Sequence, residues 1–368
     1  MNDSGLYVHI PFCSSRCLYC SFYSQTDFSF ISQWLESLRR EAGLYKSSFG
    51  LFDSIYLGGG TPSALPQSHF QELIKTLFEI FPFKEPLEFT VEANPDDVTL
   101  NSLAFFKACG VNRLSLGIQS LQDRDLAFLG RRHSGPQAER ALDLGRQAGF
   151  QSLSIDLIYG LPEQTLSAWT EALQRVITFR PDHLSCYQLT IERHTPLGAL
   201  LHQGKIRKID LGRERQFFVI TSSFLEEEGY RHYEVSNFAQ QGHECRHNLK
   251  YWDGSPYLGL GPAAHSFNGT ERWWNTRSVR RYIRRLSNRQ APLAGKEMLS
   301  EEARYLESLL LGFRTKQGIA VAMLKQVPAL DSKLRQLEKS GLVTMLGDRM
   351  VPTREGFLHA DGLPLLFS

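Results

Sequence analysis

The chain has 368 residues, 42% of them hydrophobic and 22% charged, which is typical of a globular protein with one large and one smaller domain. A net charge of +2 gives no sign of a nucleic-acid partner, no apolar run reaches the ~18 residues of a membrane span, and the N-terminus lacks a signal-peptide pattern. Three of the six cysteines lie within eight residues, which is unlike a disulfide framework and favours a reducing, cytoplasmic location.

Strand-like and helix-like segments alternate up to about residue 240. Apolar strands with little charge, as expected of strands buried on both faces, are predicted at 6–10, 54–59, 87–93, 113–119, 152–159 and 183–190. Amphipathic helices are predicted at 31–46, 67–80, 99–109, 136–148, 165–178 and 212–228. Right-handed crossovers would join these six units into a parallel sheet. Because a complete barrel has eight units, we expect a partial (β/α)6 barrel, with an open doubly wound sheet as the alternative.

The character of the sequence changes near residue 230. Residues 230–275 are rich in His, Asn, Trp, Tyr and Gly and are expected to be irregular, whereas residues 277–289 are predicted to form a basic helix. Further helices are predicted at 299–314, near 320–326 and at 331–340, followed by a hairpin to about 352. We therefore expect a barrel, a linking segment and a winged-helix-like α+β domain, at 1–235, 236–292 and 293–368.

Cys13, Cys17 and Cys20 form a C-x3-C-x2-C motif directly after the first predicted strand. Most iron–sulfur clusters take one thiolate for each iron, so three thiolates in one loop leave one iron free to bind another molecule. The loop follows the C-terminal end of a strand, where the active sites of barrels lie. These observations favour an open-site [4Fe–4S] cluster, and a zinc site completed by His9 is the alternative.

Further motifs recur in order at the ends of the following predicted strands. They are YVHIPFC (7–13), GGGTPS (58–63), EANP (92–95), SLGIQ (115–119) and IDLIYGLP (155–162). Together with the cysteine motif they resemble the radical-SAM superfamily. Within it, the chain is similar to the branch that contains the oxygen-independent coproporphyrinogen III oxidases and their relatives, the HemW-type heme chaperones. The resemblance covers essentially the whole chain, including the C-terminal module.

The resemblance implies that S-adenosylmethionine (SAM) binds the open iron. In such proteins an electron from the cluster cleaves SAM to a 5′-deoxyadenosyl radical. By resemblance, the residues that contact the cluster-bound SAM are Tyr7, Tyr19, Gly59, Gly60, Thr61, Pro62 and Glu92. Those that line a second SAM or substrate pocket are Gln119, Arg131 and Asp156. Glycines allow a ligand to approach the backbone, and Arg can clamp a carboxylate; structural caps and ion pairs are the alternative roles.

Three features favour the chaperones over the oxidases. The oxidases carry a further cysteine two residues after the third, where this chain has Phe22, and they have an N-terminal extension before the first strand, which here begins at Leu6. The segment that starts with His247 and Asn248 and ends with Tyr251 and Trp252 matches the H-N-x-x-Y-W motif of the heme chaperones. The resemblance thus implies a protein that binds heme through His247 and delivers it to respiratory or storage hemoproteins. Radical SAM decarboxylation of coproporphyrinogen III, the reaction of the oxidases, is the alternative function, and we expect this activity to be absent.

Weaker alternatives concern the remaining motifs. His243, Cys245 and His247 would face one side of an extended segment, which would suit zinc or heme. The 277–289 helix could meet heme propionates, an acidic partner or anionic lipid at a membrane surface, or be a solvated face. Heme binding could favour a dimer. A zinc-stabilised nucleic-acid-binding protein is the remotest alternative, and we expect no nucleic-acid partner.

Overall fold

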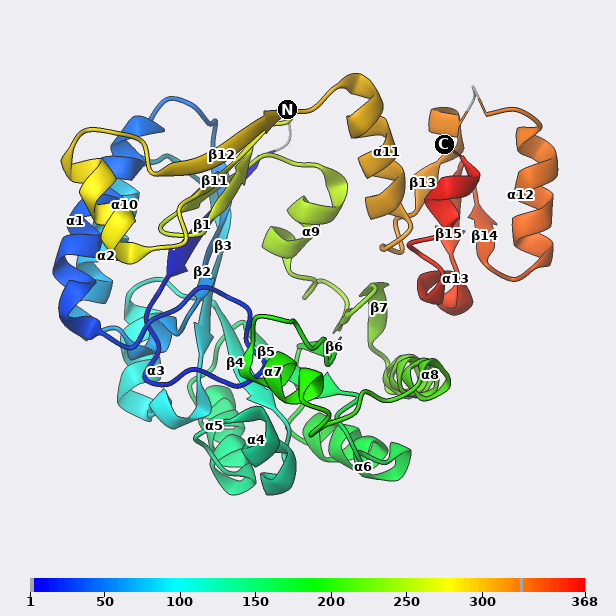
Figure 1. Ribbon diagram of the computed structural model, residues 1–368, viewed down its shortest axis with the longest axis horizontal. Helices are drawn as coiled ribbons and strands as arrows, with labels where there is room; N and C mark the ends of the chain where they lie inside the picture. The colour runs from blue at the N-terminus through cyan, green and yellow to red at the C-terminus, as the bar shows by residue number, and fades with distance from the viewer. Residues whose placement is uncertain (1–2, 325–326, 368) are drawn as a thin grey trace.

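A curved sheet organises most of the protein, as seen in a computed structural model that describes residues 3–324 and 327–367 (Figure 1). Its centre consists of the six predicted strands, β1 (Ser4–Ile10), β2 (Phe52–Gly59), β3 (Phe83–Ala93), β4 (Arg113–Gln119), β5 (Ser152–Tyr159) and β6 (His183–Gln188). Each strand pairs in parallel with the next one along the chain. This order lacks the reversal of a doubly wound sheet. The predicted partial barrel is therefore confirmed.

Helices cover the outer face of these strands. The six predicted helices lie within two residues of their predicted ends: α1 (Ile31–Leu44), α2 (Gln67–Ile80), α3 (Leu100–Ala108), α5 (Gly135–Gln147), α6 (Leu166–Ile177) and α8 (Leu211–Glu227). Two short helices, α4 (Asp123–Leu129) and α7 (Pro196–His202), have seven residues each, which is too short for a helical period to reveal them. Thr99 and Ser134 form capping boxes that set the starts of α3 and α5. None of the described helices is long and apolar enough to cross a bilayer.

Alternation along the central strands separates an apolar outer face from a polar inner face. In β4, Leu114 and Leu116 are fully buried in the core shared with the helices, whereas Arg113 and Ser115 point to the other side. The low charge of these strands correctly predicts burial on both faces, but the inner face is polar. Buried polar groups need partners, so the barrel interior requires either protein donors and acceptors or a polar ligand.

The expectation that residues 230–275 are irregular is wrong. They form β7 (Arg231–Glu234), β8 (Asn237–Ala239), α9 (Arg246–Asp253), β9 (Tyr257–Leu260), β10 (His265–Phe267) and β11 (Glu271–Asn275). β8 pairs antiparallel with β6, and β9 pairs parallel with β1, so the segment extends both edges of the sheet. Strands of three to five residues are too short to show a clear period of two, which hides them in the sequence.

The large sheet continues past residue 292. β12 (Leu293–Met298) pairs with β11, which gives twelve strands in the order β12-β11-β10-β9-β1-β2-β3-β4-β5-β6-β8-β7 within the described residues. The predicted basic helix is α10 (Val279–Ser287), which packs against α1 and buries Tyr282, whose hydroxyl donates to Glu41 at 2.5 Å. The domain boundaries expected at residues 235 and 292 stay a prediction.

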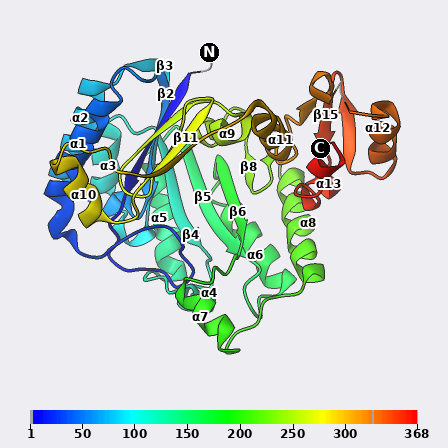
Figure 2. The same cartoon turned by 45° about the horizontal axis from the view of Figure 1, so that its top comes forward.

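The C-terminal module has a hydrophobic core of its own. It contains α11 (Glu301–Gly312), α12 (Leu330–Lys339), α13 (Arg354–Leu358) and a small antiparallel sheet of β13 (Ile319–Ala320), β15 (Arg349–Pro352) and β14 (Val343–Leu346). The helix predicted near 320–326 is a 3-10 turn, Val321–Leu324, and its last two residues lie outside the described residues. The module lies beside α8 (Figure 2), where Arg354 donates to Ser222 and Ser223 at 2.7 Å.

The end of β2 approaches β1 so closely that only glycine fits there. Gly59 has a φ of 101°, and a Cβ built on it would lie 2.4 Å from Nδ1 of His9. Its backbone N–H donates to Oε2 of Glu92 at 3.2 Å. The conformation and the space at this position both exclude a side chain.

We expect Gly59→Ala to lower the free energy of unfolding by about 2–4 kcal/mol, because alanine is strained at this φ and its methyl group overlaps His9. Urea unfolding measures the change. Gly50→Ala is the matched control, since a Cβ there has no atom within 4 Å, and it should change stability by less than about 0.5 kcal/mol. Equal effects of the two substitutions would contradict the packing argument.

Glu234 lies where the large sheet meets the C-terminal module. It forms a bridge with Thr315, and its neighbours Tyr233 and Val235 exchange backbone hydrogen bonds with Lys316 and Arg314. The side chain is fully buried, and Oε2 has no hydrogen-bond partner among the described residues. Burial raises the pKa of this carboxyl from 4.5 to about 8.

The raised pKa of Glu234 makes stability depend on pH. Between pH 4.5 and about 8 the unfolded chain loses this proton while the folded protein keeps it, so stability falls as the pH rises through that range. Glu234→Gln cannot ionise at this position. Its free energy of unfolding should therefore rise by about 3–5 kcal/mol relative to that of the wild type between pH 4.5 and about 8. Denaturant unfolding at pH 5 and pH 8 tests this, with the exposed Glu302→Gln as control. If the difference in free energy of unfolding between Glu234→Gln and the wild type is the same at pH 5 and pH 8, Glu234 is not the source of the pH dependence.

Candidate functional site

A cavity of about 420 Å³ extends from the C-terminal ends of the central strands into the barrel. Gln119, the last residue of β4, lines it near the opening, and Arg113, the first residue of the same strand, lines its inner end. The three cysteines of the motif lie in the loop after β1 and also line this cavity. The structure therefore brings the cysteine loop and the barrel interior into one site.

The cysteine loop is anchored to the barrel by backbone hydrogen bonds. The N–H of Cys13 donates to the carbonyl of Gln25, and the N–H of Leu18 donates to that of Leu129, both at 3.0 Å. All three cysteines are free thiols, and burial raises the pKa of Cys13 and raises that of Cys20 to about 11. Metal binding would displace these protons, because thiolates are the ligands.

The donor set fits an iron–sulfur cluster better than a single metal ion. Within residues 3–324 and 327–367, no three His, Cys, Asp or Glu side chains converge on one ion. In a cluster each cysteine binds a different iron, so such convergence is not needed. His9, the alternative zinc ligand, has both ring nitrogens in hydrogen bonds, to the Tyr7 hydroxyl at 3.2 Å and the Tyr23 carbonyl at 2.7 Å.

Two side chains from other parts of the barrel reach the cysteine sulfurs. The hydroxyl of Thr61 donates to Sγ of Cys13, and Nη1 of Arg131 donates to Sγ of Cys17, each at 3.3 Å. Nη2 of Arg131 also donates to the carbonyl of Gly117 and to Oδ1 of Asn94, both at 2.7 Å, while its Nε is buried without a partner among the described residues. A cation here would stabilise the negative charge of cluster thiolates.

Two buried carboxyl groups face the cavity. Burial raises the pKa of Glu92 to about 7, helped by repulsion from Asp156, and burial raises the pKa of Asp156 to about 6. Tyr56 donates to Glu92 at 2.8 Å, and Ser115 donates to Asp156 at 3.2 Å. Both carboxyls lie where they could accept hydrogen bonds from hydroxyl or amino groups of a ligand.

Most residues predicted to bind SAM line the same cavity. They are Tyr19, Gly59, Gly60, Thr61, Pro62, Glu92, Gln119, Arg131 and Asp156. Tyr7 is not among the lining residues; its ring packs near His9 and Tyr56, at centroid distances of 6.1 and 6.2 Å. The cavity-lining residues that the sequence reasoning missed include, on β3 to β6, Thr90, Arg113, Ser115, Ser154, His183, Ser185 and Tyr187. Polar and apolar residues alternate along β3 to β6, and this alternation is the sequence signal that could have identified them, because the polar residues face the cavity.

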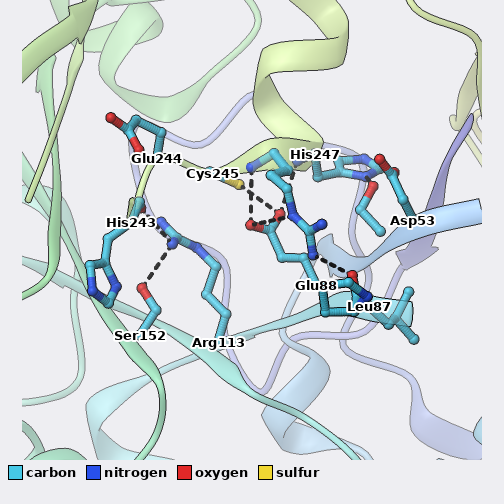
Figure 3. A network of polar contacts seen from close by, with 12 residues as sticks. Asp53, Leu87, Glu88, Arg113, Ser152, His243, Glu244, Cys245 and His247 are labelled. Carbon is cyan, nitrogen blue, oxygen red and sulfur yellow. Dashed lines mark hydrogen bonds and ion pairs between the residues drawn. The ribbon is translucent and has the colours of Figure 1, made fainter. Parts of the chain in front are cut away.

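His247, labelled in Figure 3, lies in α9, and Figure 1 shows α9 on the other side of the barrel from the loop that follows β1. Its ring is 1% exposed, with Nδ1 bonded to the Ser54 hydroxyl at 3.1 Å and Nε2 to the Tyr251 hydroxyl at 3.0 Å. Burial lowers the pKa of His247 to about 3. Neither nitrogen is free for iron in this conformation, so the site does not fit a heme unless α9 moves. Its role as heme ligand stays a prediction.

The expectation that His243, Cys245 and His247 share one side of an extended segment is wrong. Cys245 is the N-cap of α9, and His247 belongs to the helix itself. Glu88 accepts the backbone N–H of His247 at 2.9 Å and the thiol of Cys245 at 3.6 Å. A carboxylate at the start of a helix is favourable, so this end of α9 is held by the barrel rather than by a metal.

Sequence comparisons match the chain to known proteins over almost its full length. The Radical SAM superfamily model matches residues 7–176, and the HemN C-terminal domain model matches residues 299–359. Heme chaperone HemW of Mycobacterium tuberculosis (strain ATCC 25618 / H37Rv) is 34% identical over 365 residues, which cover 98% of this chain and 93% of that protein. The HemW of Bacillus subtilis (strain 168) is 32% identical over 362 residues, covering 96% of each chain.

A solved structure gives the same fold. Coproporphyrinogen III oxidase (HemN) from Escherichia coli superposes with a TM-score of 0.83 at 24% identity, covering 99% of this chain and 90% of that one. This likeness shows the fold, whereas the sequence identity to the chaperones shows the family. The chain belongs to the HemW-type heme chaperones of the radical SAM superfamily.

Proposed function

We propose that this protein binds heme and a [4Fe–4S] cluster that carries SAM, and that it passes heme to acceptor hemoproteins. The observation that carries the proposal is the gathering of three free cysteines over a barrel cavity, in a chain about one-third identical to proteins named heme chaperones. Respiratory or storage hemoproteins are the proposed acceptors. A cytoplasmic location and a heme-dependent dimer belong to the same proposal.

The residues around the cavity suit cluster and SAM binding. Cys13, Cys17 and Cys20 would hold the cluster, which with SAM supplies one-electron chemistry when bound. Arg131 is held beside the cysteines by its hydrogen bonds to Cys17 and Asn94, where its positive charge would attract the carboxylate of SAM. Glu92, which accepts a hydrogen bond from Tyr56, would also accept hydrogen bonds from the ligand.

Decarboxylation of coproporphyrinogen is not part of the proposed function. Phe22 occupies the position where the oxidases carry a further cysteine, and its side chain is 65% exposed beside the cysteine loop. An exposed aromatic ring at the cavity opening offers a flat apolar surface instead of a thiol. Anaerobic incubation with coproporphyrinogen, SAM and a reductant should therefore give no decarboxylated product.

Metal analysis tests the cluster. After anaerobic reconstitution the wild type should contain about four irons and four sulfides per chain, and Cys17→Ala should lose most of both, because one ligand and the contact with Arg131 disappear. Cys109→Ala, a cysteine at the end of α3 outside the cavity, should retain them. Stoichiometric zinc without sulfide would overturn the cluster proposal.

Hemin titration followed at the Soret band tests His247. If His247 is the ligand, His247→Ala should lose the ligand-field signature, and hydrogen exchange of α9 should increase on heme binding because the buried ring must be released. Ser54→Ala removes one hydrogen-bond partner but keeps the imidazole, so it should bind heme at least as well as wild type. An unchanged Soret band in His247→Ala would exclude this ligand and leave heme binding itself intact.

A further inference from the structure

Arg113 lies inside the barrel at the end remote from the cysteine loop. Its side chain is 3% exposed, and Nη1 donates to the Ser152 hydroxyl at 2.8 Å and to the carbonyl of His243 at 2.9 Å (Figure 3). Its Nε has no hydrogen-bond partner among the described residues. At a rise of about 3.3 Å per residue, Arg113 is about 20 Å along β4 from Gln119.

The charge of Arg113 has no ion-pair partner in the part of the chain that the structure describes. Glu88 is close, but its oxygens accept the backbone N–H groups of Arg246 and His247 at 3.0 and 2.9 Å. Cys245 is also close, and burial raises the pKa of its thiol to about 12, which keeps it neutral at pH 7. Burial opposes the charge of Arg113, but neighbours that include Glu88 raise its pKa overall. Because no carboxylate in the described chain lies within 4.0 Å of the guanidinium, a ligand carboxylate could make the direct ion pair that the protein does not supply.

Asp156 shares the cavity but does not pair with Arg113. In the register of β4 and β5, Arg113 lies opposite Ser152, whereas Asp156 lies opposite Gly117, four residues nearer the opening. Its oxygens instead accept from the hydroxyl of Ser115. Asp156 and Glu92 therefore line the cavity nearer its opening than Arg113 does, although the charge of Arg113 still acts on the Asp156 carboxylate and favours its charged form.

Thr90 adds a second unpartnered polar group at this inner end. It lies opposite Arg113 in the register of β3 and β4, and both residues line the cavity of about 420 Å³. Thr90 is fully buried, and its hydroxyl has no hydrogen-bond partner within the described chain. The guanidinium of Arg113 bonds to Ser152 on the β5 side, and Thr90 lies on the β3 side of the same inner end of the cavity. A guanidinium and a hydroxyl that line one cavity suit the acceptor atoms of a carboxylate.

We propose that Arg113 and Thr90 form a carboxylate-binding site on the floor of the barrel, for the molecule held beneath the cysteine loop. Under the proposed function, on which the identity of this ligand rests, the carboxylate is a heme propionate. The methionyl carboxylate of a SAM molecule is the other source of the same chemistry. Binding there would fix how deeply the ligand enters the barrel.

Paired ligands test this site. Binding of hemin and of hemin dimethyl ester is followed at the Soret band, and binding of SAM and of decarboxylated SAM by equilibrium dialysis, for wild type and Arg113→Gln. In one of the two pairs, the wild type should bind the ligand with the free carboxylate about tenfold to hundredfold more tightly than the ligand without it. Arg113→Gln should lose this difference in affinity. Arg124→Gln, an exposed arginine paired with Glu163, should keep it.

The two ligand pairs separate this site from the proposed function. If wild type binds neither hemin nor its ester, the heme function fails, and the SAM pair alone decides on the carboxylate site. An unchanged preference in Arg113→Gln for both pairs would overturn the site. If Arg113→Gln does not fold, Thr90→Val and Arg113→Lys replace it, and each should reduce the preference because one donor or the planar fork is lost.

Discussion

The polar inner face of the six central strands is the constraint on which the rest of the structure depends. Buried polar groups must find partners, and the two ends of the barrel meet this requirement in different ways. At the inner end α9 supplies backbone N–H groups to Glu88 and the ring of His247 to Ser54. At the other end the barrel stays open, and the cavity lined by Glu92 and Asp156 is left for a ligand.

The cysteine loop depends on this barrel for its shape. Its backbone is tied to neighbouring segments, and its sulfurs receive hydrogen bonds from Thr61 and Arg131. Arg131 also binds the carbonyl of Gly117 at the end of β4, so the loop and the strand ends form one unit. Loss of any of these hydrogen bonds would change both the positions of the cysteines and the strand ends that lie next to them.

The predictions that hold are those that rest on patterns among residues close together in the sequence. The central strands and their helices are 6 to 17 residues long, which is enough for their composition to indicate them, and the residues of each strand-end motif are close together in the sequence. Strands β8 and β10, with three residues each, show no such pattern, so the segment around them was wrongly expected to be irregular. The H-x-C-x-H spacing misled for the same reason, because the start of α9 is set by Glu88, a residue far away in the sequence.

The sequence by itself determined the six strand–helix units, the cysteine loop and a set of strand-end residues that line the cavity, because these follow from local spacing and from the rule that parallel strands end at one edge. Only the tertiary structure decided what surrounds His247 and Arg113. The first is bonded to Ser54, 193 residues away, and the second to the carbonyl of His243, 130 residues away. No local pattern encodes such contacts, since they arise when α9 enters the closed end of the barrel.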